Sequence, residues 1–282
     1  MATAERSSAS AEVVVAPPTG WGALDLRELW AHRELLYFLT KRELQVRYAQ
    51  SFFGVAWVVL QPLVLAFILA LFLGHFAHTL SGQGVPAAVF AVSGLVPWLF
   101  TAAAVTNAAN SLVQDAPLIS KVYFPRLALP LSKALSLLID LAIALVVLLV
   151  ITFVYGVGIQ STFFLVPVFL LLGIVSAFAV GTWFAAINVK YRDVGQVVPM
   201  LVQILFFLTP ILYSSTIVPE KWQYILALNP MVAVIDGVRW SLYGIDFPHP
   251  GIILVSVGSA LALLVGSLIY FHRTEQYFAD VV

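Results

Sequence analysis

The sequence has no cysteine and few charged residues, and both shortages exclude whole classes of protein. Without cysteine the chain cannot form a disulfide, a thiolate nucleophile or a Cys-ligated zinc or iron–sulfur site. Only 10% of the 282 residues are charged, against about 25% in an average soluble domain. The 14 basic residues are balanced by 14 acidic ones, so no excess positive charge is present to bind nucleic acid.

The chain also lacks the G-x-x-x-x-G-K-[ST] pattern, whose backbone N–H groups hold nucleotide phosphates. It is therefore not expected to hydrolyse ATP by that route. No apolar run has more than one acid, which argues against a transferase that holds a metal through clustered carboxylates. His75 and His78 are spaced to suit a metal, but we interpret them as the polar end of a membrane segment.

Apolar residues make up 61% of the chain and gather into six runs of about 20 residues, the length that crosses a bilayer. The predicted spans are 53–73, 87–112, 127–155, 163–187, 197–213 and 251–271. Every Lys and Arg except Lys221 and Arg239 lies in the N-terminal region, the tail, or the connections after spans two and four with their flanks. Because basic residues stay on the cytoplasmic side, the pattern predicts an all-α integral membrane protein with both termini cytoplasmic.

Two segments precede the first span. Residues 1–24 are rich in Ala, Ser and Pro, and are predicted to be a disordered cytoplasmic tail. Residues 25–50 predict an amphipathic helix that lies in the membrane interface, and residues 51–282 form the transmembrane domain. The apolar stripe of this helix comprises Leu26, Leu29, Trp30, Tyr37, Leu44 and Tyr48. It serves either as a plain anchor or, as we favour, as a surface on which a cytosolic partner sits.

The connection between spans two and three predicts a second cytoplasmic feature. Pro117 and Pro125 bound a short helix, because proline lacks the N–H that a helix interior needs. Asp115 precedes it as a candidate N-cap. Aromatic and basic side chains then suit a groove in another protein, although they would equally pack on the chain's own spans. They are Lys121, Tyr123, Phe124 and Arg126.

Between spans five and six, residues 214–250 predict two helices too short or too polar to cross lipid alone. The first starts after Pro219, and the second has Asn229 as its N-cap. We predict a re-entrant pair, which is tolerated in a membrane where protein or water covers it. This pair is either a gate over a pathway or a simple aromatic belt. The candidate gate residues are Trp222, Tyr224, Asp236, Arg239 and Trp240, of which Asp236 and Arg239 are spaced to pair.

Three stretches, 41–63, 118–131 and 188–231, together resemble the polysaccharide-exporting members of the ABC-2 permease family. The resemblance implies a homodimer of six-span subunits in the bacterial plasma (inner) membrane, above two copies of a cytosolic ABC ATPase. ATP and magnesium would bind to the ATPase, so no cofactor is expected in this chain. The cargo would be a polysaccharide attached to a polyprenyl pyrophosphate, which would pass through a channel between the two subunits.

The resemblance also assigns expected roles to residues. The amphipathic helix and the short helix after span two would dock the ATPase through Arg33, Glu34, Leu118, Lys121, Tyr123, Phe124 and Arg126. Sugars stack on aromatic faces, so the candidate channel residues are Trp57, Phe67, Trp98, Phe206, Phe207 and Tyr213. Arg47 and Tyr48 are candidates for the lipid pyrophosphate because guanidinium suits phosphate, although Arg47 equally fits the positive-inside bias.

Asp140 is the one acid well inside a predicted span, and it has no obvious basic partner there. Such residues usually face a cavity or a partner. Lys133 lies two turns earlier on the same helix face, at the expected interface. A proton-coupled carrier is therefore one alternative function, and an ABC-2 permease for a drug or small lipid is a nearer one.

Overall fold

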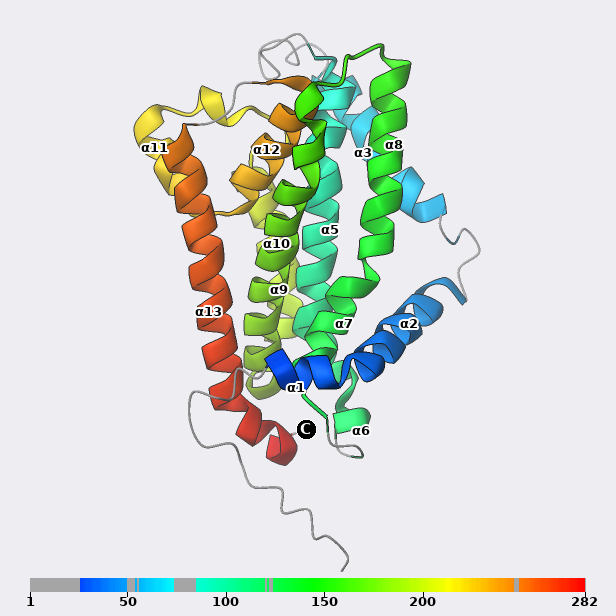
Figure 1. Cartoon of the computed structure of the whole chain (residues 1–282), viewed down its shortest axis with the longest axis vertical. Helices are drawn as coiled ribbons and strands as arrows, with labels where there is room; N and C mark the ends of the chain where they lie inside the picture. The colour runs from blue at the N-terminus through cyan, green and yellow to red at the C-terminus, as the bar shows by residue number, and fades with distance from the viewer. Residues whose placement is uncertain are drawn as a thin grey trace, which may run out of the picture.

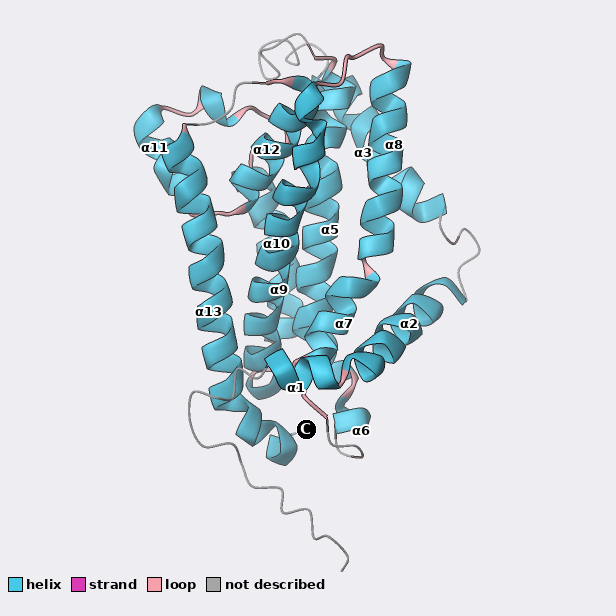
Figure 2. Ribbon diagram, viewed as in Figure 1, coloured by secondary structure: helices cyan, strands magenta, loops and turns pink. Residues whose placement is uncertain are grey.

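The computed structural model describes residues 26–49, 54, 56–73, 85–119, 121, 124–245 and 249–281. The predicted tail 1–24, His75, His78 and Tyr123 lie outside these residues. Within the described part, the regular secondary structure is helical throughout (Figure 2). In chain order the elements are α1 (Leu26–Ala31), α2 (Arg33–Ala49), α3 (Ala56–Leu73), α5 (Ala87–Gln114), α6 (Ala116–Ile119), α7 (Ala128–Ser136), α8 (Leu138–Val154), η2 (Ser161–Leu165), α9 (Val166–Lys190), α10 (Val194–Leu208), η3 (Ser215–Ile217), α11 (Glu220–Leu226), α12 (Met231–Tyr243) and α13 (Pro250–Val281).

Helix α5 is the centre of the bundle and contacts α3, α7, α8, α9, α10 and α12 (Figure 1). Its approach to α9 is close because small residues meet there. A Cβ built on Gly181 would lie only 2.6 Å from the Cβ of Ala108. Small residues of this kind let membrane helices bring their backbones together.

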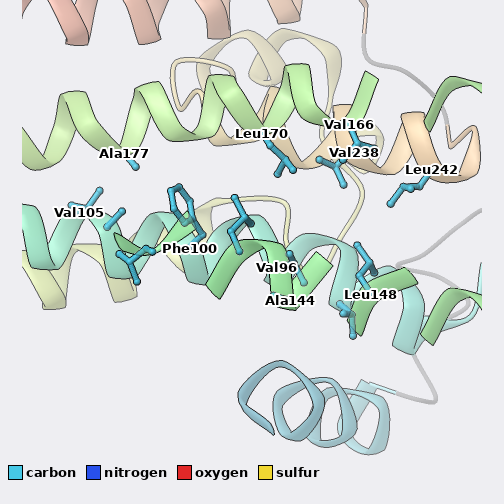
Figure 3. Close-up of a cluster of buried hydrophobic side chains, with 14 of the residues drawn as sticks. Val96, Phe100, Val105, Ala144, Leu148, Val166, Leu170, Ala177, Val238 and Leu242 are labelled. Carbon is cyan, nitrogen blue, oxygen red and sulfur yellow. The ribbon is translucent and has the colours of Figure 1, made fainter. Parts of the chain in front are cut away.

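The main apolar core joins α5, α8, α9 and α12, with Ala134 of α7 and Val198 of α10 (Figure 3). It includes Val96, Phe100 and Val105 of α5, Ala144 and Leu148 of α8, Val166, Leu170 and Ala177 of α9, and Val238 and Leu242 of α12. Helix α12, the second helix of the predicted re-entrant pair, is therefore part of the bundle's core.

Opposite ends of the bundle carry different features. Helices α1 and α6 lie at the same end as the C-terminus, which we call the α6 end (Figure 1). Helix α11 and the α8–η2 connection lie at the other end, which we call the α11 end (Figure 1). The predicted docking elements and the predicted gate are thus at opposite ends.

Four stretches are long and apolar enough to cross a membrane: Ala87–Gln114, Ala128–Val154, Ser161–Lys190 and Pro250–Glu275. Helices α11 and α12 form a pair bent by 110°. In the places of predicted spans one and five, the structure has shorter apolar stretches, Ala56–Leu65 and Val194–Leu208. These findings define an all-helical, multi-pass membrane protein.

Predicted span five extends too far, because α10 ends at Leu208 and not at Tyr213. Thr209 is extended, with ψ of 141°. The reason is Pro210, since a residue before proline is pushed out of the helical region. The five residues after Leu208 therefore present backbone carbonyls that no helix satisfies.

The predicted interface helix is broken at His32 into α1 and α2. Only part of the predicted stripe faces the bundle, where Leu29 packs. Leu39 is buried, with Leu35 and Leu36 packed beside it, whereas Trp30 and Tyr37 are 71% and 63% exposed. The two aromatic rings are thus turned away from the bundle.

Candidate functional site

At the α6 end, α2 packs against α7 through alternating charges. The Nζ of Lys133 lies 2.8 Å from Glu43 Oε2 and 3.4 Å from Asp115 Oδ2. The other carboxylate oxygen of Asp115 accepts a hydrogen bond from Arg42 Nη2 at 2.9 Å. We call Arg42, Glu43, Asp115 and Lys133 the α2 ionic cluster. Asp115 was predicted to cap α6, but its carboxylate faces the two cations of this cluster.

One turn further along α2, Arg47 and Tyr48 both reach Asp140 of α8. Arg47 Nη1 donates to Asp140 Oδ2 at 2.8 Å and its Nη2 donates to Ser136 Oγ at 3.1 Å. The phenol of Tyr48 donates to Asp140 Oδ1. Burial, followed by the hydrogen bond to the Asp140 carboxylate, raises the pKa of Tyr48 to about 12, so the phenol keeps its proton.

These contacts change the interpretation of two predicted residues. The interpretation of Asp140 as an acid without a basic partner is wrong, because it lies in the first turn of α8 and pairs with Arg47. Arg47 and Tyr48 remain candidates for the lipid pyrophosphate, yet a phosphate would have to compete there with the Asp140 carboxylate.

The predicted docking residues divide into exposed and covered groups. Arg33, Glu34 and Lys121 are exposed, and Leu118 is half-buried. Phe124 is 4% exposed within an apolar cluster around Leu39 and Leu129, so its ring offers a partner no surface. The guanidinium of Arg126 donates to the backbone carbonyl of Glu275 and thereby ties this connection to α13. The predicted coupling helix is a single turn, α6, and α7 begins at Ala128.

At the α11 end, the guanidinium of Arg239 is almost completely buried, with 1% exposed, and makes five hydrogen bonds. A guanidinium has five N–H donors, so every donor is used. The acceptors are Ser93 Oγ (3.3 Å) and the carbonyl oxygens of Phe90 (3.2 Å), Pro210 (2.7 Å), Ile211 (2.5 Å) and Tyr213 (3.3 Å). Arg239 therefore satisfies three carbonyls of the turn that follows α10, and joins α12 to α5 and to this turn.

Two further features surround this arginine. Its charge lies 3.6 Å from the centre of the Phe90 ring and, at 3.9 Å, pairs with Asp236 as the spacing predicted. The second carboxylate oxygen of Asp236 has no hydrogen-bond partner among the described residues. Gly94 leaves room for the guanidinium, because a Cβ there would lie 2.7 Å from Arg239 Nη2 and 2.9 Å from the Ile211 oxygen.

The two gate helices are held very differently. Helix α11 starts at Glu220 as predicted, and α12 starts at Met231, one residue after the predicted Pro230, where the Asn229 side chain accepts the N–H of Met231. Almost all of α12 is buried, and Tyr243 at its end shares a 2.8 Å hydrogen bond with Thr152 of α8. By contrast, α11 is exposed or half-buried along its whole length, with Trp222 54% and Tyr224 40% exposed. Trp240 on α12 is half-buried.

The candidate channel aromatics fall into two groups. Trp98 lies 6.1 Å from Phe206, and Phe206 lies 5.2 Å from Phe207, measured between ring centres. Of these three, Phe207 is strongly exposed, at 69%. Trp98, by contrast, is buried in the core between α5 and α12. Trp57 and Phe67 are exposed on α3, and the hydroxyl of Tyr213 donates to the Leu208 carbonyl. Within one chain, then, Trp98 presents no surface to a channel.

Sequence reasoning missed the α2 ionic cluster and the carbonyl partners of Arg239. The first had only a weak signal, because Arg42 and Glu43 are opposite charges near the end of an apolar helix pattern and Asp115 and Lys133 are opposite charges that flank the next connection. The second had a weaker signal in Pro210, which predicts a helix end with exposed carbonyls. Neither pattern names its partner helix.

The class that these features define is a multi-pass helical membrane protein with charged contacts at one end and a bent helix pair at the other. Residues 34–243 match the family model described as ABC-2 type transporter. The chain belongs to this family.

Curated relatives cover most of the chain. An O-antigen export system permease protein RfbA from Myxococcus xanthus is 31% identical over 260 residues, which is 91% of this chain and 98% of that protein. An RfbA protein from Klebsiella pneumoniae is 30% identical over 250 residues, 88% of this chain and 95% of that protein. The polysialic acid transport protein KpsM from Escherichia coli is 24% identical over 240 residues, 83% of this chain and 91% of that protein.

Proposed function

We propose that this chain is the permease subunit of an ATP-driven exporter that moves a polyprenyl-pyrophosphate-linked polysaccharide across the bacterial plasma membrane. The likeness to O-antigen permeases over 91% of the chain carries this proposal. A second relative is named for polysialic acid, so the shared feature of these cargoes is a long, polar sugar polymer. Because the chain lacks a nucleotide-binding loop, a separate ABC ATPase supplies the energy.

The proposed assembly is a homodimer of six-span subunits with two ATPases at the α6 end. Six apolar segments support the span count: α3, α5, α7–α8, α9, α10 and α13. The 15 residues of α10 extend about 22 Å, less than the roughly 30 Å of hydrocarbon. The turn after Leu208, whose carbonyls accept from Arg239, completes the crossing. The positive-inside pattern then places the α6 end and both termini in the cytoplasm.

The proposed path for the polymer runs between two subunits beside α3 and α10, with a gate at the α11 end. Exposed aromatic rings on these helices, Trp57, Phe67 and Phe207, support this path because sugars stack on such faces. Of the two gate helices, α11 is the one that moves, since α12 is fixed to α5, α8 and α10 by the contacts of Arg239 and Tyr243. The exposed residues Arg33, Glu34 and Lys121 form the docking surface for the ATPase.

The test is coexpression with the ABC ATPase that the proposal expects in the same organism, copurification and reconstitution into vesicles. We expect a stable complex that transports the host's own lipid-linked polymer only when ATP is supplied. An ATPase with a disabled nucleotide site is the control and should abolish transport. Transport that persists with the disabled ATPase would establish an ion-driven carrier. ATP-driven transport of a drug or a small lipid, with none of the polymer, would establish the alternative cargo.

A further inference from the structure

Lys133 is a buried lysine at the point where three elements of the α6 end meet. Its side chain is only 8% exposed, and lysines are almost never buried without partners. The ammonium has three N–H donors and faces three acceptors: Glu43 Oε2 (2.8 Å), Asp115 Oδ2 (3.4 Å) and Gln114 Oε1 (3.5 Å). The first acceptor comes from α2, and the other two come from the end of α5.

The charges around Lys133 balance within the cluster. Asp115, 5% exposed, also receives Arg42, while Glu43 is 15% exposed. Cation and carboxylate therefore alternate in the order Arg42, Asp115, Lys133, Glu43, with no net charge. A balanced cluster tolerates burial, whereas loss of one member leaves its neighbour buried without a counter-charge. Lys133 is the one member that touches both carboxylates.

The position of the cluster gives it a mechanical consequence. Glu43 belongs to the interface helix α2, and Asp115 lies directly between α5 and the single turn α6. Helices α2 and α6 belong to the predicted docking surface. Lys133 itself lies on α7, which continues into the span α8. The apolar cluster beside it, around Leu39 and Phe124, holds the same elements together without fixing their direction.

We propose that Lys133 is a positioning residue for export: it ties α2 and the α5–α6 junction to the span α7–α8, so that movement of a docked ATPase reaches the span. This inference rests on the proposed function. Removing the tie uncouples the two activities, because the ATPase still docks and hydrolyses ATP while the span no longer follows.

The experiment compares Lys133→Met with Lys133→Arg in the reconstituted complex with its ATPase. Two quantities are measured on equal amounts of assembled complex: the rate of ATP hydrolysis and the amount of native lipid-linked polymer transported. Lys190→Met is the matched control, since Lys190 is an exposed lysine at the last position of α9, which ends at the α6 end (Figure 1). Glu43→Gln is a milder second variant that leaves Lys133 paired with Asp115.

We expect Lys133→Met to hydrolyse ATP at close to the wild-type rate but to move about tenfold less polymer per ATP, a size usual for coupling residues. Lys133→Arg should restore the ratio, because it keeps the charge, and Lys190→Met should match wild type. A purely structural role would reduce the amount of complex and leave the ratio unchanged, which overturns the inference.

Should Lys133→Met fail to assemble, Glu43→Gln decides. A lower ratio of polymer to ATP supports the tie, and a wild-type ratio refutes it. If the wild-type complex itself moves no polymer, the proposed function is wrong and the inference falls with it. The two failures are therefore distinguishable by the wild-type sample alone.

Discussion

Replacement of Arg239 by methionine tests whether this residue holds the α11 end together through backbone carbonyls. Removal of one partner from a buried charged pair costs about 3–5 kcal/mol. Each buried carbonyl left without a donor adds about 1–3 kcal/mol, and those of Pro210, Ile211 and Tyr213 lie beyond the end of α10. We therefore expect a loss of at least about 6 kcal/mol, or a fall in the melting midpoint of roughly 12 °C or more.

Two companion variants separate the carbonyl contacts from the ion pair. Arg239→Lys keeps the charge but has three donors in place of five, so we expect about half the loss. Asp236→Asn removes the carboxylate 3.9 Å away and leaves all five hydrogen bonds, so its loss should be limited to the ion-pair share of about 3–5 kcal/mol and stay below that of Arg239→Met. The measurement is thermal unfolding of the purified complex in detergent, followed by tryptophan fluorescence. If Asp236→Asn unfolds as early as Arg239→Met, the ion pair is the main contribution and the reasoning is refuted.

Two other predictions concern the packing of Gly94 against Arg239 and the pair of Arg47 with Asp140. Gly94→Ala places a Cβ against the guanidinium of Arg239 and should lower the melting midpoint, whereas Gly258→Ala, with nothing within 4 Å on α13, should leave it unchanged or raise it; equal midpoints would show that the arginine has room to move. Asp140→Asn keeps an acceptor for Arg47, so polymer transport by reconstituted vesicles should stay near wild type; complete loss with normal expression would instead favour proton coupling.

The amphipathic helix shows how far a periodic pattern is informative. Helical spacing predicted an interfacial helix over 25–50, and the structure has helix over almost all of the part it describes. The stripe did not say which residues face the bundle, because Leu29 packs there whereas Trp30 and Tyr37 are exposed. Which face is buried depends on what the rest of the chain packs there, and that surface comes from α7 and the residues around Phe124.

The candidate gate shows the same division. Pro219, Asn229 and Pro230 predicted where each short helix begins, because caps and prolines act within one turn. The Asp236–Arg239 pair was also predicted from its spacing. Nothing nearby in the sequence indicated that the Arg239 side chain gives all its hydrogen bonds to residues at least 26 positions earlier in the chain, two of which are 146 or more positions earlier.

By itself the sequence determined that the chain is a helical membrane protein, roughly where its helices lie and which side carries the positive charge. The first two properties follow from hydrophobic burial, which has no direction and grows with the length of an apolar run, and the third follows from the positive-inside bias. The tertiary structure alone decided which charge meets which. An ion pair such as Lys133 with Glu43, or a hydrogen bond from Arg239 to Phe90, needs two distant helices in one particular register. That register is set by packing of the whole bundle and not by any local pattern.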